Sequence, residues 1–236
     1  MRPTSFVLLA ALSLAGCIDS TTFASHNVEV RFHRALPAAG VRELRVVNVA
    51  GSITVMSWNR PSVDVGALEY GSDQAAIERT HIVAGSSGPT VLVKTQYDNS
   101  GSIFGNQNGA EVDYTIHVPK SLSVSVTNVS GPTTLNGIGG NVDATEVSGR
   151  LDASLGTLSG ARTVHMSAIS GRITVRITRN SNARVDASTI SGPVNLFFPS
   201  NIRQGVVGNS ATGRIGKGTS SMTLHTVSGP IAVEPE

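Results

Sequence analysis

The stretch that decides the fold is Ile169-Ser170-Gly171-Arg172-Ile173-Thr174-Val175. Its glycine permits a backbone bend at which a Cβ atom would clash. Ile173 and Val175 lie two and four residues after the glycine, so they share one face of an extended chain while the residues between them face solvent. We expect Ile169, two residues before the glycine, to lie on that same apolar face. The stretch therefore predicts two strands that meet at a glycine corner and face one core.

The same order of an apolar residue, a small residue and glycine recurs along the chain. The corner glycines predicted in this way are Gly51, Gly131, Gly149, Gly160, Gly171, Gly192, Gly213 and Gly229. From Gly131 onward they are separated by 18, 11, 11, 21, 21 and 16 residues, which suggests coils of about 20 residues, some of them divided in two. One such unit cannot bury its apolar face alone, whereas stacked units share a core and pair their strand edges. We therefore predict an all-β fold, a β-solenoid or β-helix-like stack. A β-sandwich with glycine turns is the alternative.

The repeat is imperfect at three places where an inward apolar side chain is expected. Thr133, Arg162 and Lys217 occupy these places. Either the register shifts there, or these copies lie at an end of the stack. Proline follows the glycine in three copies, which is tolerable at a corner or at the first residue of a strand.

The amino-terminal part of the domain reads differently. Alternating apolar residues between 28 and 118 predict less regular antiparallel strands, each half buried. Residues 73–80 are the one plausible short helix, and the composition of 98–109 predicts an exposed loop. Because no linker separates the two parts, we predict one continuous β-repeat domain over 28–234. Residues 28–120 would form its irregular strands and 121–234 its Ser-Gly corner repeats.

The first residues have the features of an export signal. A single positive charge precedes an apolar run at 6–14, and small residues precede Cys17. The run is too short to cross a bilayer as a helix, which needs about 20 apolar residues. Cys17 is the only cysteine, so it forms no disulfide within the chain, and a free thiol in an oxidising compartment would be a liability.

The stretch Leu14-Ala15-Gly16-Cys17 resembles the cleavage site of bacterial lipoproteins. The resemblance implies cleavage before Cys17, a lipid on its sulfur and a fatty acid such as palmitate on the new amino terminus. Each buried CH₂ of such chains contributes about 0.8 kcal/mol to membrane anchoring. We expect 1–16 to be the signal peptide and 17–27 the anchor and tether. An ordinary secretory signal with a chance cysteine is the alternative. Asp19 is one place later than an inner-membrane retention signal would be, which favours the outer membrane.

Composition and motifs exclude several classes of function. Charged residues are 14% of the chain and the net charge is +2, with basic residues scattered and not clustered as nucleic-acid binding requires. No histidines are spaced as metal ligands, and no nucleophile or phosphate-loop motif occurs. We therefore expect no nucleic-acid partner, no cofactor, no metal site and no catalytic residues. The best enzyme alternative is a polysaccharide lyase or hydrolase that uses carboxylates among Asp143, Glu146, Asp152 and Asp186.

The repeats also resemble a known family. Residues 48–55 (Asn-Val-Ala-Gly-Ser-Ile-Thr-Val), 118–122 (Val-Pro-Lys-Ser-Leu) and the Ser-Gly repeats resemble the bacterial putative-adhesin family of β-strand repeat domains, whose function is unknown. The resemblance covers about 28–234 and implies a β-helical envelope domain with no established enzymatic activity. The residue after the glycine is often aspartate in such repeats. Here no copy has aspartate, so an acidic ladder that could bind calcium is absent; the residues at this place are Ser52, Pro132, Arg150, Ala161, Arg172, Pro193, Arg214 and Pro230.

These observations together predict an envelope lipoprotein that is anchored to the membrane through Cys17. Its non-enzymatic β-repeat scaffold would serve adhesion or bind an envelope component, a protein or a polysaccharide, by broad and weakly charged contacts. Self-association through exposed strands at the ends of the stack is a further expectation. A carbohydrate-active enzyme on a β-helix and a purely structural assembly protein are the alternatives.

Overall fold

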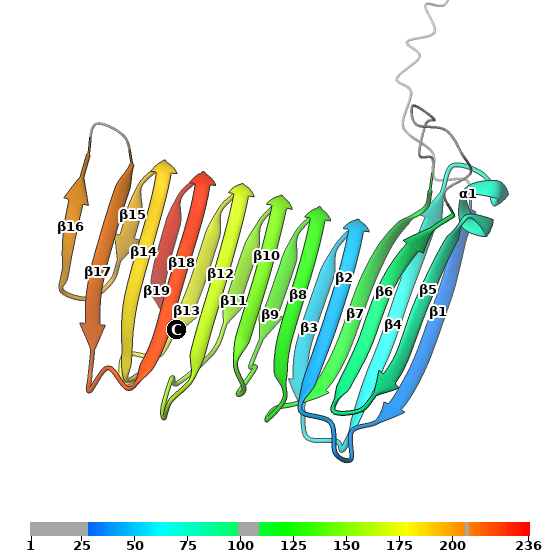
Figure 1. The fold of residues 1–236 in the computed structure, drawn as a ribbon, viewed down its shortest axis with the longest axis horizontal. Coiled ribbons are helices and arrows are strands. Elements are labelled where there is room, and N and C mark those ends of the chain that lie inside the picture. The colour runs from blue at the N-terminus through cyan, green and yellow to red at the C-terminus, as the bar shows by residue number, and fades with distance from the viewer. Residues whose placement is uncertain (1–27, 99–108, 206–207) are drawn as a thin grey trace, which may run out of the picture.

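Two β-sheets packed face to face form the whole described structure (Figure 1). The computed structural model describes residues 28–98, 109–205 and 208–236. The predicted signal peptide, Cys17, the tether and most of the predicted loop at 98–109 lie outside these residues. Among the described residues, no helix has the length and apolar character that a membrane crossing requires.

The nine-stranded sheet contains, in spatial order, β1 (Val28–Pro37), β4 (Ser62–Gly71), β7 (Glu111–Pro119), β3 (Ile53–Trp58), β9 (Thr133–Asn136), β11 (Leu151–Ser154), β13 (Ile173–Ile177), β19 (Ile231–Pro235) and β15 (Val194–Leu196). The ten-stranded sheet contains β16 (Ser200–Gln204), β17 (Asn209–Ile215), β14 (Ala183–Ser191), β18 (Ser220–Ser228), β12 (Thr163–Ser170), β10 (Val142–Ser148), β8 (Ser123–Ser130), β2 (Glu43–Ala50), β6 (Thr90–Tyr97) and β5 (Thr80–Ser87). Helix α1 (Gln74–Glu78) falls within the predicted helical segment, and the side chain of Asp73 caps its first turn.

Six strand pairs form coils in which the chain passes from one sheet to the other at a glycine. The coils are β2–β3, β8–β9, β10–β11, β12–β13, β14–β15 and β18–β19. Within each sheet the strands of neighbouring coils are parallel, as in the register of Ile173 with Ile231 and of Leu151 with Ile173. Stacked coils pair all their interior strand edges, which is why repetition of a short unit suffices to build the domain. The predicted all-β stack is therefore confirmed.

The corner glycines lie directly above one another. A Cβ added to Gly171 would overlap the carbonyl oxygen of Gly149, and one added to Gly229 would overlap that of Gly171. The Gly171 amide also donates to Ser228 O of the neighbouring coil (2.9 Å). The order of the corners along the stack is Gly51, Gly131, Gly149, Gly171, Gly229 and Gly192. Glycine is required here because the backbones of adjacent coils approach too closely for any side chain.

Two of the eight glycines expected at corners lie elsewhere. Gly160 is in the connection from β11 to β12 and has open space around it. Gly213 lies inside β17, where a Cβ would collide with the ring of Phe198. The interpretation as corners is thus corrected for these two. Both follow a small residue, but Gly160 lies in a loop between coils and Gly213 makes room for an aromatic ring of the core.

The stacking order of the coils differs from their order in the chain. The coil β18–β19 lies between β12–β13 and β14–β15, and β2–β3 lies between β6–β7 and β8–β9. The carboxyl terminus consequently ends within the stack and not at its end (Figure 1). The connection from β13 to β14 spans the width of the coil β18–β19, which is about 10 Å at ordinary strand spacing.

One continuous apolar core fills the space between the sheets. Ile173 and Val175 are fully buried, and so are the equivalent residues after the other corners except Leu196, which is partly buried. Thr174, between Ile173 and Val175, is buried too, at 4% exposed, so the expectation that it faces solvent is wrong. The apolar residue two before each glycine is not buried, however: Ile169 is 53% exposed. That part of the prediction is wrong because the strand keeps its two-residue alternation up to the corner, so that Ala168 points inward and Ile169 outward.

A row of mostly polar side chains lines the inside of the corners. It is formed by the residue three before each glycine, namely Asn48, Asn128, Glu146, Ala168, Thr226 and Thr189. Asn128 Nδ2 donates to Gly51 O (3.1 Å) and Gly131 O (3.2 Å), and Thr226 Oγ1 donates to Gly171 O (3.3 Å). Buried backbone carbonyls need such partners, so this row stabilises the bends.

The three irregular positions have different explanations. Thr133 is fully buried, and its hydroxyl donates to Glu146 Oε2 (2.9 Å). Arg162 is half buried, and its guanidinium donates to Ile138 O and Gly140 O, which fastens one coil to the next. Lys217 is exposed in the turn after β17. Thr133 therefore keeps the expected inward register, and the other two lie outside the corner repeats.

The amino-terminal end combines the predicted antiparallel strands with part of the stack. Strands β1, β4 and β7 are antiparallel neighbours, as are β5 and β6. Strands β2 and β3 nevertheless pair in parallel with β8 and β9. The regular stack therefore begins before residue 121, because the copy at Gly51 is a full member of it.

Candidate functional site

The outer face of the ten-stranded sheet carries a line of exposed apolar side chains beside the corners. We call it the ridge, and it consists of Val49, Val129, Val147, Ile169, Val227 and Ile190 in stack order, of which Val147 is only partly exposed. Ile169 and Ile190 are the most exposed of them, at 53% and 51%. Single exposed apolar residues are ordinary, but a contiguous row is typical of a surface that contacts something else.

A shallow groove of about 430 Å³ runs across the same face on β2, β8, β10 and β12. One row of its lining follows the strand register from Arg45 through Ser125 and Asp143 to His165. Arg45 is paired with Glu43 at 3.2 Å. The groove thus offers hydroxyl, carboxylate and imidazole groups in a regular row, an arrangement suited to many weak polar contacts.

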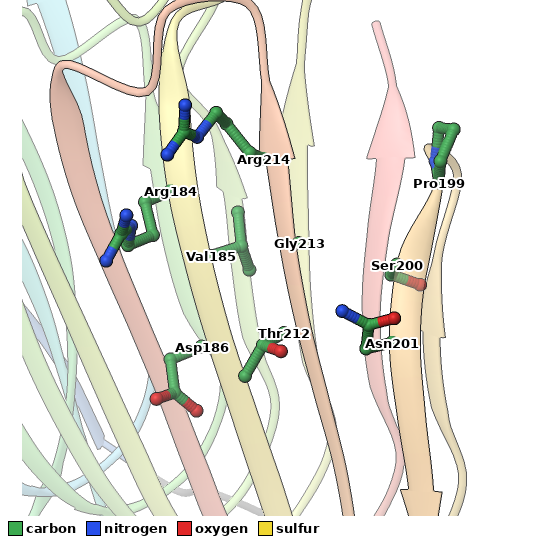
Figure 2. Close-up of a pocket in the computed structure, with 9 residues that line it drawn as sticks. All are labelled: Arg184, Val185, Asp186, Pro199, Ser200, Asn201, Thr212, Gly213 and Arg214. Carbon is green, nitrogen blue, oxygen red and sulfur yellow. The ribbon is translucent and has the colours of Figure 1, made fainter.

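A larger hollow, of about 680 Å³, lies on this face at the far end of the stack. We call it the arginine pocket; its lining is Arg184, Val185, Asp186, Pro199, Ser200, Asn201, Thr212, Gly213 and Arg214. Figure 2 shows that the two guanidinium groups lean to the same side, that of Arg214 from β17 over β14 and that of Arg184 from β14 away from β17, with Asp186 and Thr212 farther along the strands. The pocket exists because β17 and β16 are antiparallel additions to the parallel stack.

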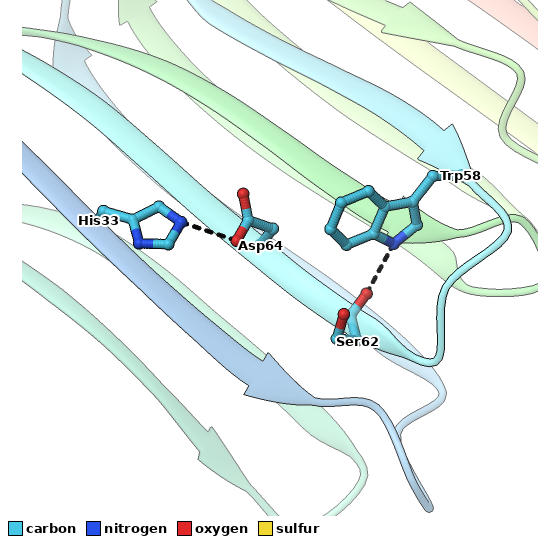
Figure 3. Close-up of polar contacts among 4 residues, drawn as sticks. All are labelled: His33, Trp58, Ser62 and Asp64. Atoms are coloured by element: carbon cyan, nitrogen blue, oxygen red, sulfur yellow. Dashed lines mark hydrogen bonds and ion pairs between the residues drawn. The ribbon is translucent and has the colours of Figure 1, made fainter.

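On the outer face of the nine-stranded sheet, the side chains around Trp58 close a turn. Trp58 Nε1 donates to Ser62 O (2.8 Å), and His33 Nε2 lies 2.8 Å from Asp64 Oδ1 (Figure 3). The Trp58 ring stacks on His117 with 5.1 Å between ring centroids, so His117 is half buried and does not project freely to solvent as its strand position suggests. This indole is engaged by its own neighbours and does not form an open binding platform.

The four carboxylates considered for an enzyme do not come together. Asp143 and Asp186 lie on the outer face of the ten-stranded sheet with two strands between theirs, and Asp152 is on the other sheet, paired with Arg150 (2.9 Å). Glu146 is fully buried inside the corners. Paired carboxylates must flank one bond to hydrolyse it, so this set offers no such pair.

Glu146 is unusual because it is an acid inside the core. Burial raises the pKa of its carboxyl to about 7, against the lowering effect of hydrogen bonds from Thr133 and Asn128. Glu146 Oε1 and Asn128 Oδ1 lack hydrogen-bond partners among the described residues, and their strands pair these two residues directly. Both atoms are acceptors, so a proton on Glu146 would supply the donor that they lack.

The predictions about metal and lipid sites are compared with the described residues in turn. No group of three or more His, Cys, Asp or Glu among the described residues could hold a metal ion. Cys17, the predicted lipid site, is outside the described part.

The sequence did not reveal the arginine pocket, because Arg184 and Arg214 are 30 positions apart and meet only through the antiparallel pairing of β14 with β17. The outward alternation of Arg184 and Asp186 was the one available signal.

Comparison with solved structures supports the fold. A putative cell adhesion protein from Clostridium sporogenes is similar with a TM-score of 0.61 and 11% identity, over 89% of this chain and 100% of that one. A putative adhesin from Bacteroides fragilis gives a TM-score of 0.28 and 14% identity, over 86% of this chain and 97% of that one. At such identities the first of these supports the architecture alone.

Comparison of sequences identifies the family. No curated protein matches the chain. Residues 105–234, more than half of the chain, match the family described as Toastrack DUF4097. The chain therefore belongs to the Toastrack DUF4097 family, and the resemblance of its Ser-Gly repeats to a β-repeat family of unknown function is confirmed.

Proposed function

We propose that this protein is a non-enzymatic binding scaffold, held at a bacterial envelope membrane by acyl chains on Cys17. Its outer ten-stranded face would bind another envelope component. The observation that carries the proposal is that one sheet face carries the ridge, the polar groove and the arginine pocket. The family and the fold support a scaffold, and the separation of the four carboxylates argues against a glycosidase.

The two kinds of surface on this face have complementary uses. Apolar side chains of the ridge contribute roughly 25 cal/mol per Å² of apolar surface that a partner covers. The hydroxyl, amide and charged groups of the groove fix orientation through hydrogen bonds. A regular repeat presents the same groups at each coil, so that many individually weak contacts add along the stack.

The outer-membrane location and the lipid anchor remain predictions from the amino-terminal residues. Acyl chains on Cys17 would leave the tether at 18–27 to separate the β domain from the bilayer. That arrangement would keep the ten-stranded face accessible to a soluble or surface-bound component. Metabolic labelling with a radioactive fatty acid tests the anchor: wild type should incorporate the label and Cys17→Ser should not.

The test of the binding function is a pull-down from envelope extract. The wild-type chain and the soluble Cys17→Ser chain are compared, since a component recovered by both is bound by the β domain and not merely present in the same membrane. A third chain, Ile169→Ser/Ile190→Ser, removes the two most exposed apolar side chains of the ridge. We expect the same component with the first two chains and several-fold less with the third. The proposal is contradicted if the component is recovered only by the chain that has Cys17, or if Ile169→Ser/Ile190→Ser recovers as much of it as wild type.

Self-association is the competing use of the same scaffold. The edge strand β1 carries charged side chains, including Glu29, Arg31 and Arg34, and charge on an edge opposes pairing with a second chain. Analytical ultracentrifugation of Cys17→Ser should therefore give a monomer. A stable dimer would favour the assembly alternative.

A further inference from the structure

The arginine pocket has an electrostatic feature that the rest of the outer face lacks. Arg184 and Arg214 are direct cross-strand partners in the antiparallel pair of β14 and β17. Both are exposed on the outer face, and neither forms an ion pair with a described residue. Like charges placed opposite each other on a sheet are destabilising. An anionic ligand held between them would remove that repulsion.

The chain around the pocket is basic. Between residues 179 and 217 there are five basic residues, Arg179, Arg184, Arg203, Arg214 and Lys217, and one acidic residue, Asp186. Several other exposed arginines are neutralised by a neighbour: Arg45 pairs with Glu43, Arg150 with Asp152 and Arg176 with Glu234. Arg184 and Arg214 have no such partner among the described residues, so they retain the positive charge that a ligand could use.

The local fold positions the Arg214 side chain. Arg214 is the next-to-last residue of β17, and its stem lies against Gly218, where a Cβ would come within 3.0 Å of Arg214 Cγ. Gly218 has a φ of +66°, and the turn that contains it is closed by Lys217 N donating to Asn182 Oδ1 (2.8 Å). The side chain thus rests on a defined turn, which lowers the entropy that binding would cost.

The other end of the pocket is polar but not basic. One row of the register places Asn201, Thr212, Asp186 and Thr223 on four neighbouring strands, β16, β17, β14 and β18. This row lies about 7 Å along the strands from the two arginines, the length of two residues. Carboxylate, amide and hydroxyl groups together accept and donate hydrogen bonds as sugar hydroxyls require.

We propose that the arginine pocket binds an acidic saccharide, with its carboxylate or phosphate between Arg184 and Arg214 and its hydroxyl groups on the row of Asp186, Thr212 and Asn201. A guanidinium fork matches the two oxygens of such an anion in a bidentate manner. Asp186 repels a bare anion but accepts hydrogen bonds from sugar hydroxyls, so the pocket selects a sugar unit whose charged group lies on the arginine side and whose hydroxyl groups face Asp186. The inference rests on the proposed binding function and names the ligand class for it.

Isothermal titration calorimetry of the purified full-length chain tests this assignment. The probes are trigalacturonate, its fully methylated ester as the uncharged match, glucose 1-phosphate, and inorganic phosphate alone. We expect at least one of the two acidic saccharides to bind. If trigalacturonate binds, its methyl ester should bind at least ten-fold more weakly. Inorganic phosphate should bind more weakly than the acidic saccharide. Loss of two charge-assisted contacts in Arg184→Gln/Arg214→Gln should weaken binding about ten-fold or more.

The control variant is Arg172→Gln, which removes an exposed arginine at a corner away from the pocket, and its affinity should equal that of wild type. Thermal unfolding checks that all variants are folded. The site is refuted if neither acidic saccharide binds, if the ester binds as tightly as the acid, if phosphate alone binds as well as the saccharide, or if the double variant binds like Arg172→Gln. In any of these cases, a component still recovered from envelope extract by Arg184→Gln/Arg214→Gln would leave the scaffold function standing and exclude only this ligand.

Discussion

The same few residues form the inside and the outside of each corner, but the inside needs close packing against the next coil and the outside displays an apolar side chain to solvent. Inside, Gly171 contacts the backbone of the next coil, and Ala168 belongs to the row that lines the bend. Outside, Ile169 is exposed on the ridge. One tripeptide thus contains a residue that permits stacking and a residue that is displayed. Substitutions inside should therefore change stability, and substitutions outside should change binding, which makes the comparison open to experiment.

The largest effect is expected from a side chain placed inside a corner. Gly171→Ala would put a methyl group into the carbonyl of Gly149, and because both partners are backbone the coils must separate. We expect a loss of about 3 kcal/mol or more in the free energy of unfolding, measured by urea denaturation. The matched control is Gly85→Ala on β5, where an added Cβ meets nothing within 4 Å. A similar loss in both variants would show that the close approach of the corners is not the cause.

An intermediate effect is expected from the buried acid of the inner row. The pKa of Glu146 is raised by burial from its ordinary value of 4.5 to about 7. Above pH 4.5 the unfolded chain therefore holds fewer protons at this group than the folded one. Its stabilising contribution is complete below pH 4.5 and is lost as the pH rises through about 7, by up to roughly 3 kcal/mol.

Glu146→Gln should remove this pH dependence, because the amide is neutral at every pH, can donate to Asn128 Oδ1 and can still accept from Thr133. Urea denaturation at pH 5 and pH 8 provides the measurement. The decrease in the free energy of unfolding between these pH values should be smaller in the variant than in wild type. Equal decreases would mean that Glu146 is ionised throughout the range or that its burial is relieved in solution.

The sequence predicts the structure within one coil, but it does not predict the order in which the coils stack. The pattern of Ile173 and Val175 after Gly171 suffices for the strands, the corner and the buried face, since these follow from local alternation. The place of β18–β19 between β12–β13 and β14–β15 does not follow. The corner glycines and serines are nearly identical from coil to coil, so they do not specify which coil lies next to which.

The proposed binding surface depends on that same long-range order. Arg184 and Arg214 meet because β17 turns back along β14, a pairing that neither local sequence specifies. The ridge is different: the alternation that buries Ala168 already requires Ile169 to point outward. Its exposure follows from this alternation, and the expectation that the apolar residue two places before the glycine is buried is wrong because it disregards the alternation.

The smallest effect on stability, and a clear effect on binding, is expected on the outside of the corners. Ile169→Ser and Ile190→Ser replace side chains that are 53% and 51% exposed, so each should change the free energy of unfolding by less than about 0.5 kcal/mol. Recovery of the envelope component should nevertheless fall several-fold in the double variant. Ile202→Ser is the matched control, since Ile202 is 54% exposed on β16 but lies off the ridge. If Ile202→Ser lowers recovery equally, exposed apolar area in general is responsible; if only the ridge variant does, then the residue that precedes each corner by two places is the displayed half of the repeat.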